Sequence, residues 1–237
     1  MGTIWLARHG ESAGNVASAV AEREGDEMLA LDLRDADTPL TDVGRAQAEA
    51  LGDWLAESAH PARVWCSPYR RARDTAEIAC ARAGIERRIR FDERLRDREL
   101  GVLDLLSSHG VRARYPEEAA RRLRLGKFWY RPPGGESWAD VALRLRSVLP
   151  EITRDGEPTL IVAHDVVVSL VAYVLCGMSE NEILTLARER RVGNASVTTL
   201  VPDGAAWRIE GFAETDHIQQ SEAPITTHSE DPHTDVL

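Results

Sequence analysis

A short apolar segment near the N-terminus ends abruptly in charged residues, and it constrains the fold more than any other feature. Residues 4–7 are apolar, Arg8, His9 and Gly10 follow, and the small and polar residues after them are typical of a helix start. The pattern predicts a buried strand with a charged pair at its C-terminal end. Because ligands of open α/β sheets bind beyond the carboxyl ends of the strands, His9 is a candidate catalytic residue. An isolated histidine there is more often a side chain satisfied by structural hydrogen bonds, so other motifs must decide.

A second apolar segment has the same arrangement later in the chain. Residues 159–163 form an apolar run typical of a central parallel strand, and His164 and Asp165 follow it directly. Further strands are expected at residues 62–67, 196–201 and 207–212, and helices are expected after Thr41 and Ser137, both plausible N-caps. This alternation predicts an α/β fold.

Length and charge limit the number of domains and the possible partners. The chain has 237 residues, 43% of them hydrophobic, which suits one sizeable α/β domain. Its net charge of −10 at pH 7 disfavours nucleic acid or an anionic membrane surface as a partner, since both require a positive face. Arginines are concentrated between residues 63 and 98, so a small anion could still be attracted locally.

The cysteines and the N-terminus indicate the compartment. Cys66, Cys80 and Cys176 lie in apolar contexts without metal-ligand spacing, which predicts reduced core residues and no metal site. The sequence lacks an apolar run long enough to span a membrane, and it lacks the basic start of a signal peptide. We therefore expect a cytoplasmic protein.

Three motifs together indicate a family. Residues 8–12, Arg-His-Gly-Glu-Ser, are followed by Asn15, Arg71 comes shortly after the second expected strand, and His164 ends the later apolar run. These motifs resemble those of the histidine phosphatase superfamily, in the phosphoglycerate mutase-like branch and of the broad-specificity phosphatase type. The resemblance implies a three-layer αβα sandwich with a mostly parallel central sheet and a helical cap insertion over the active site.

The resemblance also implies a role for each motif residue. His9 would be the nucleophile that forms a phosphohistidine, and the phosphate would be bound by Arg8, Asn15, Arg71 and His164. The residue types suit this chemistry, because a phosphomonoester carries about two negative charges near neutral pH and binds where cations and N–H donors converge. Arginine can grip the phosphate oxygens with two parallel hydrogen bonds.

The general acid is the least certain assignment. Asp97 occupies the position at which this branch usually has a glutamate, and the shorter side chain leaves the neighbouring Glu99 as an alternative. In the acid phosphatase and phytase branch, an aspartate directly after the second histidine donates the proton, and here that residue is Asp165. The compact length and the motif between Arg8 and Asn15 favour Asp97.

The resemblance implies an enzyme, a metal-independent phosphatase without a cofactor that hydrolyses a small phosphorylated metabolite and releases inorganic phosphate. A cofactor-dependent phosphoglycerate mutase is the alternative, which the absence of tryptophan from residues 16–38 disfavours. A non-catalytic phosphate-binding regulator of the same fold is a third possibility, kept open by the shortened acid. The motifs specify neither the physiological substrate nor the oligomeric state.

The domain organisation follows from composition and from the resemblance. Residues 1–212 are expected to form the phosphatase domain, with the cap insertion at about 102–135, and residues 16–38 are expected to be an irregular surface segment. The polar and acidic residues 213–237 predict a disordered tail with solvated histidines.

Overall fold

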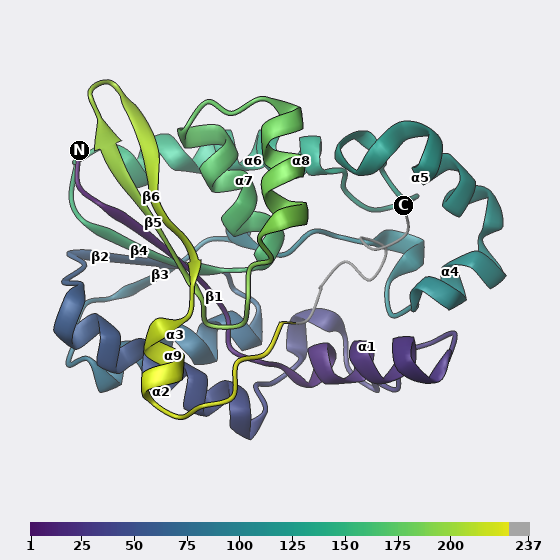
Figure 1. Ribbon diagram of the computed structural model, residues 1–237, viewed down its shortest axis with the longest axis horizontal. Helices are drawn as coiled ribbons and strands as arrows, with labels where there is room; N and C mark the ends of the chain where they lie inside the picture. Colours follow the sequence, from purple (N-terminus) through teal and green to yellow (C-terminus); the bar gives the residue numbers. More distant parts are fainter. Residues whose placement is uncertain (228–237) are drawn as a thin grey trace.

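A six-stranded sheet forms the centre of the computed structural model, which describes residues 1–227 (Figure 1). The strands are β1 (Ile4–Arg8), β2 (Arg63–Cys66), β3 (Ile89–Phe91), β4 (Thr159–Ala163), β5 (Val197–Asp203) and β6 (Ala206–Glu214). Their spatial order is β3-β2-β4-β1-β5-β6; the first four run parallel, and β5 and β6 pair antiparallel with their neighbours. The predicted α/β fold with a mostly parallel sheet is therefore confirmed.

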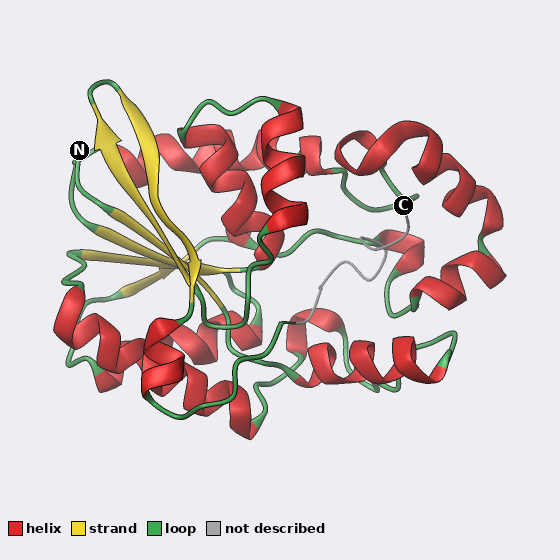
Figure 2. Cartoon of the chain, viewed as in Figure 1, coloured by secondary structure: helices red, strands yellow, loops and turns green. Residues whose placement is uncertain are grey.

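Helices cover both faces of the sheet and produce three layers (Figure 2). One face carries α2 (Asp42–Ser58), α3 (Arg70–Arg82) and α9 (Asp216–Gln220), and the other carries α6 (Trp138–Thr153), α7 (Asp165–Leu175) and α8 (Glu180–Glu189). The remaining helices are α1 (Ala13–Glu24), α4 (Ser108–Arg114) and α5 (Pro116–Trp129), with the 3₁₀ turns η1 (Asp35–Asp37), η2 (Glu93–Leu95) and η3 (Gly101–Leu103).

The period-two alternation of the strands divides the core between these faces. In β1, Ile4 and Leu6 pack with the α6 and α7 side chains, whereas Ala7 packs with those of α2 and α3. In β4, Ile161 belongs to the first cluster and Leu160 to the second. Strands buried on both faces must be apolar throughout, which is why residues 159–163 could be recognised in the sequence.

The helices α4 and α5 lie within the predicted cap insertion, and the segment after α1 is joined to them. The Leu29 N–H donates to the Leu105 carbonyl at 2.9 Å, and the Ser107 N–H donates to the Glu27 carbonyl at 3.1 Å. In Figure 1, α1, α4 and α5 lie together beyond the carboxyl ends of the parallel strands. Two segments far apart in the sequence therefore enclose this edge of the sheet.

The prediction of an irregular segment at residues 16–38 was wrong in its first part, because helix α1 extends to Glu24. Ser12 and Asn15 form a reciprocal capping box, and Gly25 ends the helix in the left-handed region at φ 75°. The apolar periodicity of this helix is weak and did not predict it, although Ser12 and Gly25 are residue types typical of helix caps.

The prediction of a disordered tail from residue 213 began too early. β6 continues to Glu214, and α9 follows, with Ile218 buried and His217 only 8% exposed. The His217 ring lies 6.0 Å from that of Trp54, and its Nε2 lies 3.0 Å from the Ala195 carbonyl, so it is not solvated as predicted. The remainder of the predicted tail, residues 228–237, lies outside the described residues.

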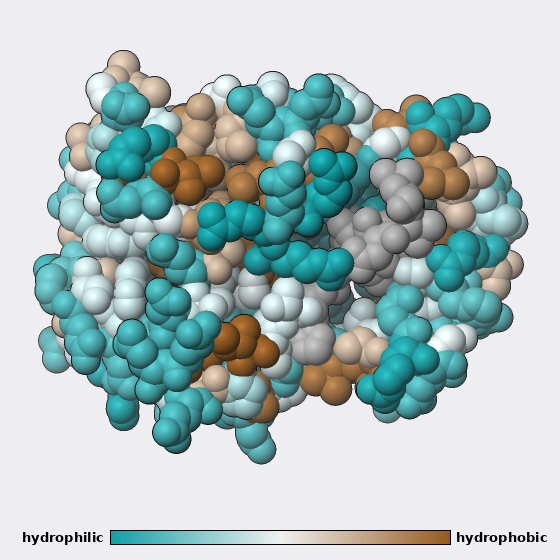
Figure 3. Space-filling view, viewed as in Figure 1, coloured by the Kyte–Doolittle hydropathy of each residue, from teal (hydrophilic) through white to brown (hydrophobic). Residues whose placement is uncertain are grey.

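One face of the molecule is largely polar. The face in Figure 3 is mostly hydrophilic, with small separate hydrophobic patches. Among residues 1–227, none of the helices has both the length and the apolar character that a bilayer crossing requires.

Gly44 allows α2 to approach the loop after β1. A Cβ atom at Gly44 would overlap the Glu11 carbonyl, and one at Gly10 would overlap the Gly44 carbonyl. We expect Gly44→Ala to lower the free energy of unfolding by about 1–3 kcal/mol, because the two backbones must separate. Urea denaturation measures this; the exposed Glu49→Ala on the same helix should change it by less than about 0.5 kcal/mol. Equal stability of the two variants would contradict this account.

His217 makes the folded protein sensitive to acid. Burial lowers the pKa of His217, so the unfolded chain binds a proton more readily than the folded one. The stability is therefore present at higher pH and is lost as the pH falls through the ordinary histidine pKa of about 6.5. His217→Gln should show a smaller drop in Tm between neutral and mildly acidic pH than the wild type. The exposed His60→Gln is the control and should keep the wild-type drop; identical profiles for all three proteins would refute the assignment.

Candidate active site

His9 and His164 meet at the edge of the sheet because β1 and β4 are adjacent and parallel. Arg8 pairs with Ala163 in the register, and the His9 N–H donates to the Ala163 carbonyl at 3.0 Å. Each histidine directly follows its strand, both are fully buried, and their ring centroids are 5.3 Å apart. The structure thus brings together two residues that lie far apart in the sequence.

The His9 ring is held in one orientation. Its Nδ1 lies 2.6 Å from the Gly10 carbonyl, which can only accept a hydrogen bond, so Nδ1 carries the proton. Nε2 then has the lone pair, and it lies 3.1 Å from Arg71 Nε. The His9 carbonyl in turn accepts from Ala195 N–H and Asn194 Nδ2. This arrangement holds a neutral imidazole with its nucleophilic nitrogen facing a guanidinium.

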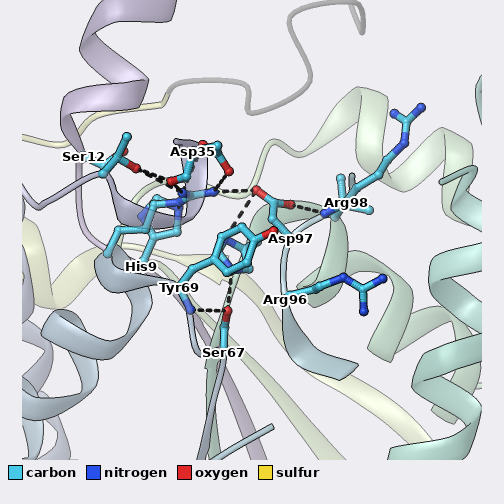
Figure 4. A network of polar contacts seen from close by, with 12 residues as sticks. His9, Ser12, Asp35, Ser67, Tyr69, Arg96, Asp97 and Arg98 are labelled. Atoms are coloured by element: carbon cyan, nitrogen blue, oxygen red, sulfur yellow. Dashed lines mark hydrogen bonds and ion pairs between the residues drawn. The ribbon is translucent and has the colours of Figure 1, made fainter. Parts of the chain in front are cut away.

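Arg71, in the first turn of α3, is the centre of the polar network (Figure 4). Its Nε and Nη2 edge faces His9 and Asp97, with Nη2 2.9 Å from Asp97 Oδ2. Its outer edge grips the Asp35 carboxylate with two hydrogen bonds of 3.1 and 3.0 Å, and Nη1 also lies 3.1 Å from Thr38 Oγ1. The fork is thereby oriented with one edge toward the His9 nitrogen.

Asp35 and Thr38 were not identified in the sequence. Both lie around η1, in a segment whose acidic and polar composition resembles any exposed loop. Neither strand nor helix periodicity marks them, and Asp35 is one of several acidic residues in that segment. Only the packing of this segment against α3 makes them ligands of Arg71.

Arg8 and His164 complete the cationic side. The Arg8 side chain at the end of β1 is fully buried, and its Nη1 donates to the Val192 carbonyl at 2.7 Å. His164 Nε2 lies 2.8 Å from the Ser67 hydroxyl at the end of β2, and its Nδ1 lies 3.4 Å from Asp97 Oδ2. The predicted basic residues therefore come from the ends of β1 and β4 and from the first turn of α3, at one edge of the sheet.

The three carboxylates considered from the sequence occupy different places. Asp97 is 6% exposed and contacts both Arg71 and His164, while its Oδ1 accepts from the Arg98 N–H at 2.7 Å. Glu99 accepts from the Tyr69 hydroxyl at 2.8 Å. Asp165 accepts from the Val166 N–H at 2.5 Å in the first turn of α7. Asp97 thus directly contacts two of the predicted phosphate-binding residues.

Asn15 lies at the edge of this network, and its position is fixed by the capping box at the start of α1. Its Oδ1 accepts from Ser12 N–H and from Asn194 Nδ2, both at 3.1 Å. Because both contacts use the carbonyl oxygen, the amide nitrogen is the group that can donate to a ligand. Asn15 also lines the cavity beside the network.

The cavity has a volume of about 70 Å³ and lies between α1, the segment after it, the Asp97 loop and the start of the cap. Its wall combines polar residues with the leucines 29, 31, 100, 105 and 106. Tyr69 forms part of it, and burial together with the hydrogen bond to Glu99 raises the pKa of Tyr69 far above its usual value. Phe128 and Tyr130 are instead buried in packing, and neither lines this cavity.

The arrangement is suited to binding an oxyanion beside a nucleophile. Buried guanidinium and imidazole groups surround the His9 nitrogen, and a carboxyl group that can exchange a proton lies next to them. Within residues 1–227, no set of three or more histidine, cysteine or carboxylate side chains is arranged to hold a metal ion.

Two proteins with similar sequences have fructose-2,6-bisphosphatase in their names, in one case together with a 6-phosphofructo-2-kinase. The chain is 32% identical over 170 residues to the 6-phosphofructo-2-kinase/fructose-2,6-bisphosphatase of Caenorhabditis elegans, covering 71% of this chain and 33% of that protein. It is 26% identical over 235 residues to the fructose-2,6-bisphosphatase of Saccharomyces cerevisiae, covering 94% of this chain and 47% of that protein. The chain therefore spans between a third and a half of the length of these relatives.

Two solved structures are similar over nearly the whole chain. The mycobacterial glucosyl-3-phosphoglycerate phosphatase, in a complex with VO3, has a TM-score of 0.73 and 28% identity, with 91% of this chain and all of that chain covered. Bacillus stearothermophilus YhfR has a TM-score of 0.75 and 30% identity, with 92% and 100% covered. The family model of the histidine phosphatase superfamily (branch 1) matches residues 4–215, and the chain belongs to this superfamily.

Proposed function

We propose that this chain is a phosphatase that hydrolyses a small phosphomonoester through a phosphohistidine on His9. The observation that carries the proposal is the orientation of the His9 ring, whose proton is held by the Gly10 carbonyl and whose Nε2 faces Arg71. The names of the similar proteins, which are phosphatases and bisphosphatases, support the same reaction class.

In the first half-reaction, Arg8, Arg71, His164 and Asn15 bind the phosphate oxygens. His9 Nε2 attacks phosphorus, the N–P bond forms, and the P–O bond to the alcohol breaks with the leaving oxygen in line. Asp97 gives its proton to that oxygen. In the ligand-free protein Asp97 is paired with Arg71; the arriving phosphate replaces it there, and the phosphate charge favours the protonated carboxyl.

In the second half-reaction, water takes the place of the alcohol. Asp97, now ionised, accepts a proton from the water, which attacks phosphorus and breaks the N–P bond. Inorganic phosphate leaves, and His9 returns to its neutral form. These steps need positioning and fixed positive charge, which the buried network supplies, and they assign no role to a metal or cofactor.

We also propose a cytoplasmic location and a small phosphorylated metabolite as the partner. The three cysteines are free; burial raises the pKa of Cys80 to about 11 and also raises that of Cys66, so these thiols are protonated and unreactive. Such cysteines suit a reducing compartment. The covered cavity favours a small molecule over a protein as the substrate.

Release of phosphate from p-nitrophenyl phosphate in excess EDTA tests the reaction. We expect turnover in the wild type and a loss of at least about 10³-fold in His9→Ala, because the nucleophile is removed. Activity that depends on a metal, or that persists in His9→Ala, would contradict the proposal. Interconversion of 2- and 3-phosphoglycerate faster than phosphate release would instead indicate the mutase.

The role of Asp97 has its own signature. We expect Asp97→Asn to lower kcat by about 10²–10⁴-fold on an alkyl phosphate, and by less in the first step with p-nitrophenyl phosphate, whose leaving group needs no proton. The variant should still bind inorganic phosphate. Glu99→Gln and Asp165→Asn are the matched controls; if either shows this dependence on the leaving group while Asp97→Asn does not, the acid is that residue.

The ion pair between Asp35 and Arg71 predicts that the thermal stability of the protein depends on bound phosphate. Asp35→Asn leaves the buried Arg71 with less compensating charge, so we expect a lower Tm without ligand. Phosphate should then raise Tm by more than it does in the wild type, since it supplies the missing negative charge. Asp37→Asn, in the same turn but paired with the exposed Arg34, is the control and should behave as the wild type. An unchanged phosphate response in Asp35→Asn would exclude this compensation.

A further inference from the structure

The cavity wall beyond the phosphate-binding residues is acidic. Asp35, Glu99 and Asp104 line it, in addition to Asp97. They come from η1, from the Asp97 loop and from the end of η3, so three separate segments converge. Burial, followed by the charges of Asp35 and Glu99, raises the pKa of Asp104, and the charge of Arg71 acts in the opposite direction.

The cations on the same wall offset this charge only in part, because the carboxylates that line the cavity outnumber the arginines. In the described part of the chain, the arginines that line the cavity are Arg71 and Arg98. Arg71 is already engaged by two carboxylates. Arg98 donates from Nε to the Glu136 carbonyl at 2.7 Å, and Figure 4 shows its guanidinium extending away from His9. Arg96 likewise extends away from His9; it pairs with Glu136 at 2.9 Å and more loosely with Glu99, at 3.5 Å.

The rest of the wall is neutral. Leucines form one part of it, and Tyr69 forms another. The centroid of the Tyr69 ring lies 5.3 Å from that of the His164 ring and 5.2 Å from Cζ of the Arg71 guanidinium. Ionised carboxylates accept hydrogen bonds and cannot donate them, so they pair well with hydroxyl groups. The leucines and the tyrosine ring would cover the C–H surface of the same molecule, and they would offer poor solvation to a second charge.

We propose that the substrate carries a single phosphate on a neutral, hydroxyl-bearing leaving group, such as a polyol or a sugar, and that Glu99 and Asp104 select against a second anionic group. The inference rests on the proposed phosphatase function and narrows its substrate class. It separates this chain from its similar proteins, since a fructose bisphosphate carries a second phosphate and a glucosyl phosphoglycerate carries a carboxylate.

Matched substrates test the selection. Glycerol 3-phosphate and 3-phosphoglycerate share a three-carbon skeleton and differ in a hydroxymethyl group against a carboxylate; fructose 6-phosphate and fructose 2,6-bisphosphate form a second pair. We expect kcat/KM to be at least about tenfold higher for the member of each pair that has the phosphate as its single anionic group, because the second anionic group is repelled by the carboxylates. Phosphoethanolamine, which has an ammonium group, tests whether the acidic wall accepts a cationic group better than a hydroxyl group.

Variants connect this ratio to named residues. Glu99→Gln and Asp104→Asn should each lower the glycerol 3-phosphate to 3-phosphoglycerate ratio by about three- to tenfold, and the double variant should lower it further. Glu117→Gln, an exposed acid on the cap, removes the same charge elsewhere and should keep the wild-type ratio. The ratio compares two substrates within one protein, so partial loss of folding does not alter it.

The outcomes separate this inference from the function on which it rests. Absence of His9-dependent turnover on every ester, p-nitrophenyl phosphate included, would overturn both. Turnover with equal or higher kcat/KM on 3-phosphoglycerate or fructose 2,6-bisphosphate would overturn the selection alone. A ratio that stays the same in Glu99→Gln and Asp104→Asn would overturn the assignment to these residues, and a clear preference for phosphoethanolamine would replace the hydroxyl-bearing group with a cationic one.

Discussion

The buried guanidinium of Arg71 is the interaction on which the site depends. It joins four parts of the chain: α3 that carries it, the strand end with His9, the loop with Asp97, and the η1 turn with Asp35. Removal of one carboxylate partner from a buried arginine lowers the free energy of unfolding by about 3–5 kcal/mol. The positions of these segments therefore depend on one another. The same pairing fixes one edge of the fork toward the His9 nitrogen, where a phosphate oxygen would need it.

The sheet supplies the precision that this network needs. Adjacent parallel strands end at the same edge of the sheet, so β1 and β4 place His9 and His164 next to each other. Close backbone contacts support the arrangement, as at Gly10 and Gly44, where a side-chain carbon would not fit. The position of the nucleophile is therefore set by rigid elements, and the segments that face the leaving group come from loops and from the cap.

In this chain, the proposed phosphate-binding residues and the proposed leaving-group wall come from different kinds of segment. The residues proposed to bind the phosphate lie at the ends of β1 and β4 and in α1 and α3, whereas the proposed leaving-group wall comes from η1, the segment of residues 97–105 and the segment after α1. Charge on the second set changes selectivity without moving the first. Here that wall is acidic and partly apolar, and this is the physical basis for expecting a neutral leaving group.

The sequence by itself determined the elements with strong local signals. The apolar run of β4, the capping residues Thr41 and Ser137, and the histidines at the two strand ends were all visible, because burial on both faces and helix capping restrict residue types locally. The short, mostly exposed edge strand β3 and the weakly periodic α1 lacked such signals, and the order at residues 213–227 comes from contacts with α2 and with residues 194–195.

Tertiary structure alone decided which carboxylates face the phosphate ligands. The motifs favoured Asp97 but left Glu99 and Asp165 open, because the distances of these carboxylates to Arg71 and His164 depend on tertiary contacts. Asp35 and Asp104 are further examples, since their roles arise from the packing of distant loops around one cavity. A local sequence pattern reflects contacts between residues that are close in the chain. A site also depends on contacts between residues far apart in the chain, and these contacts produce no periodicity in the sequence.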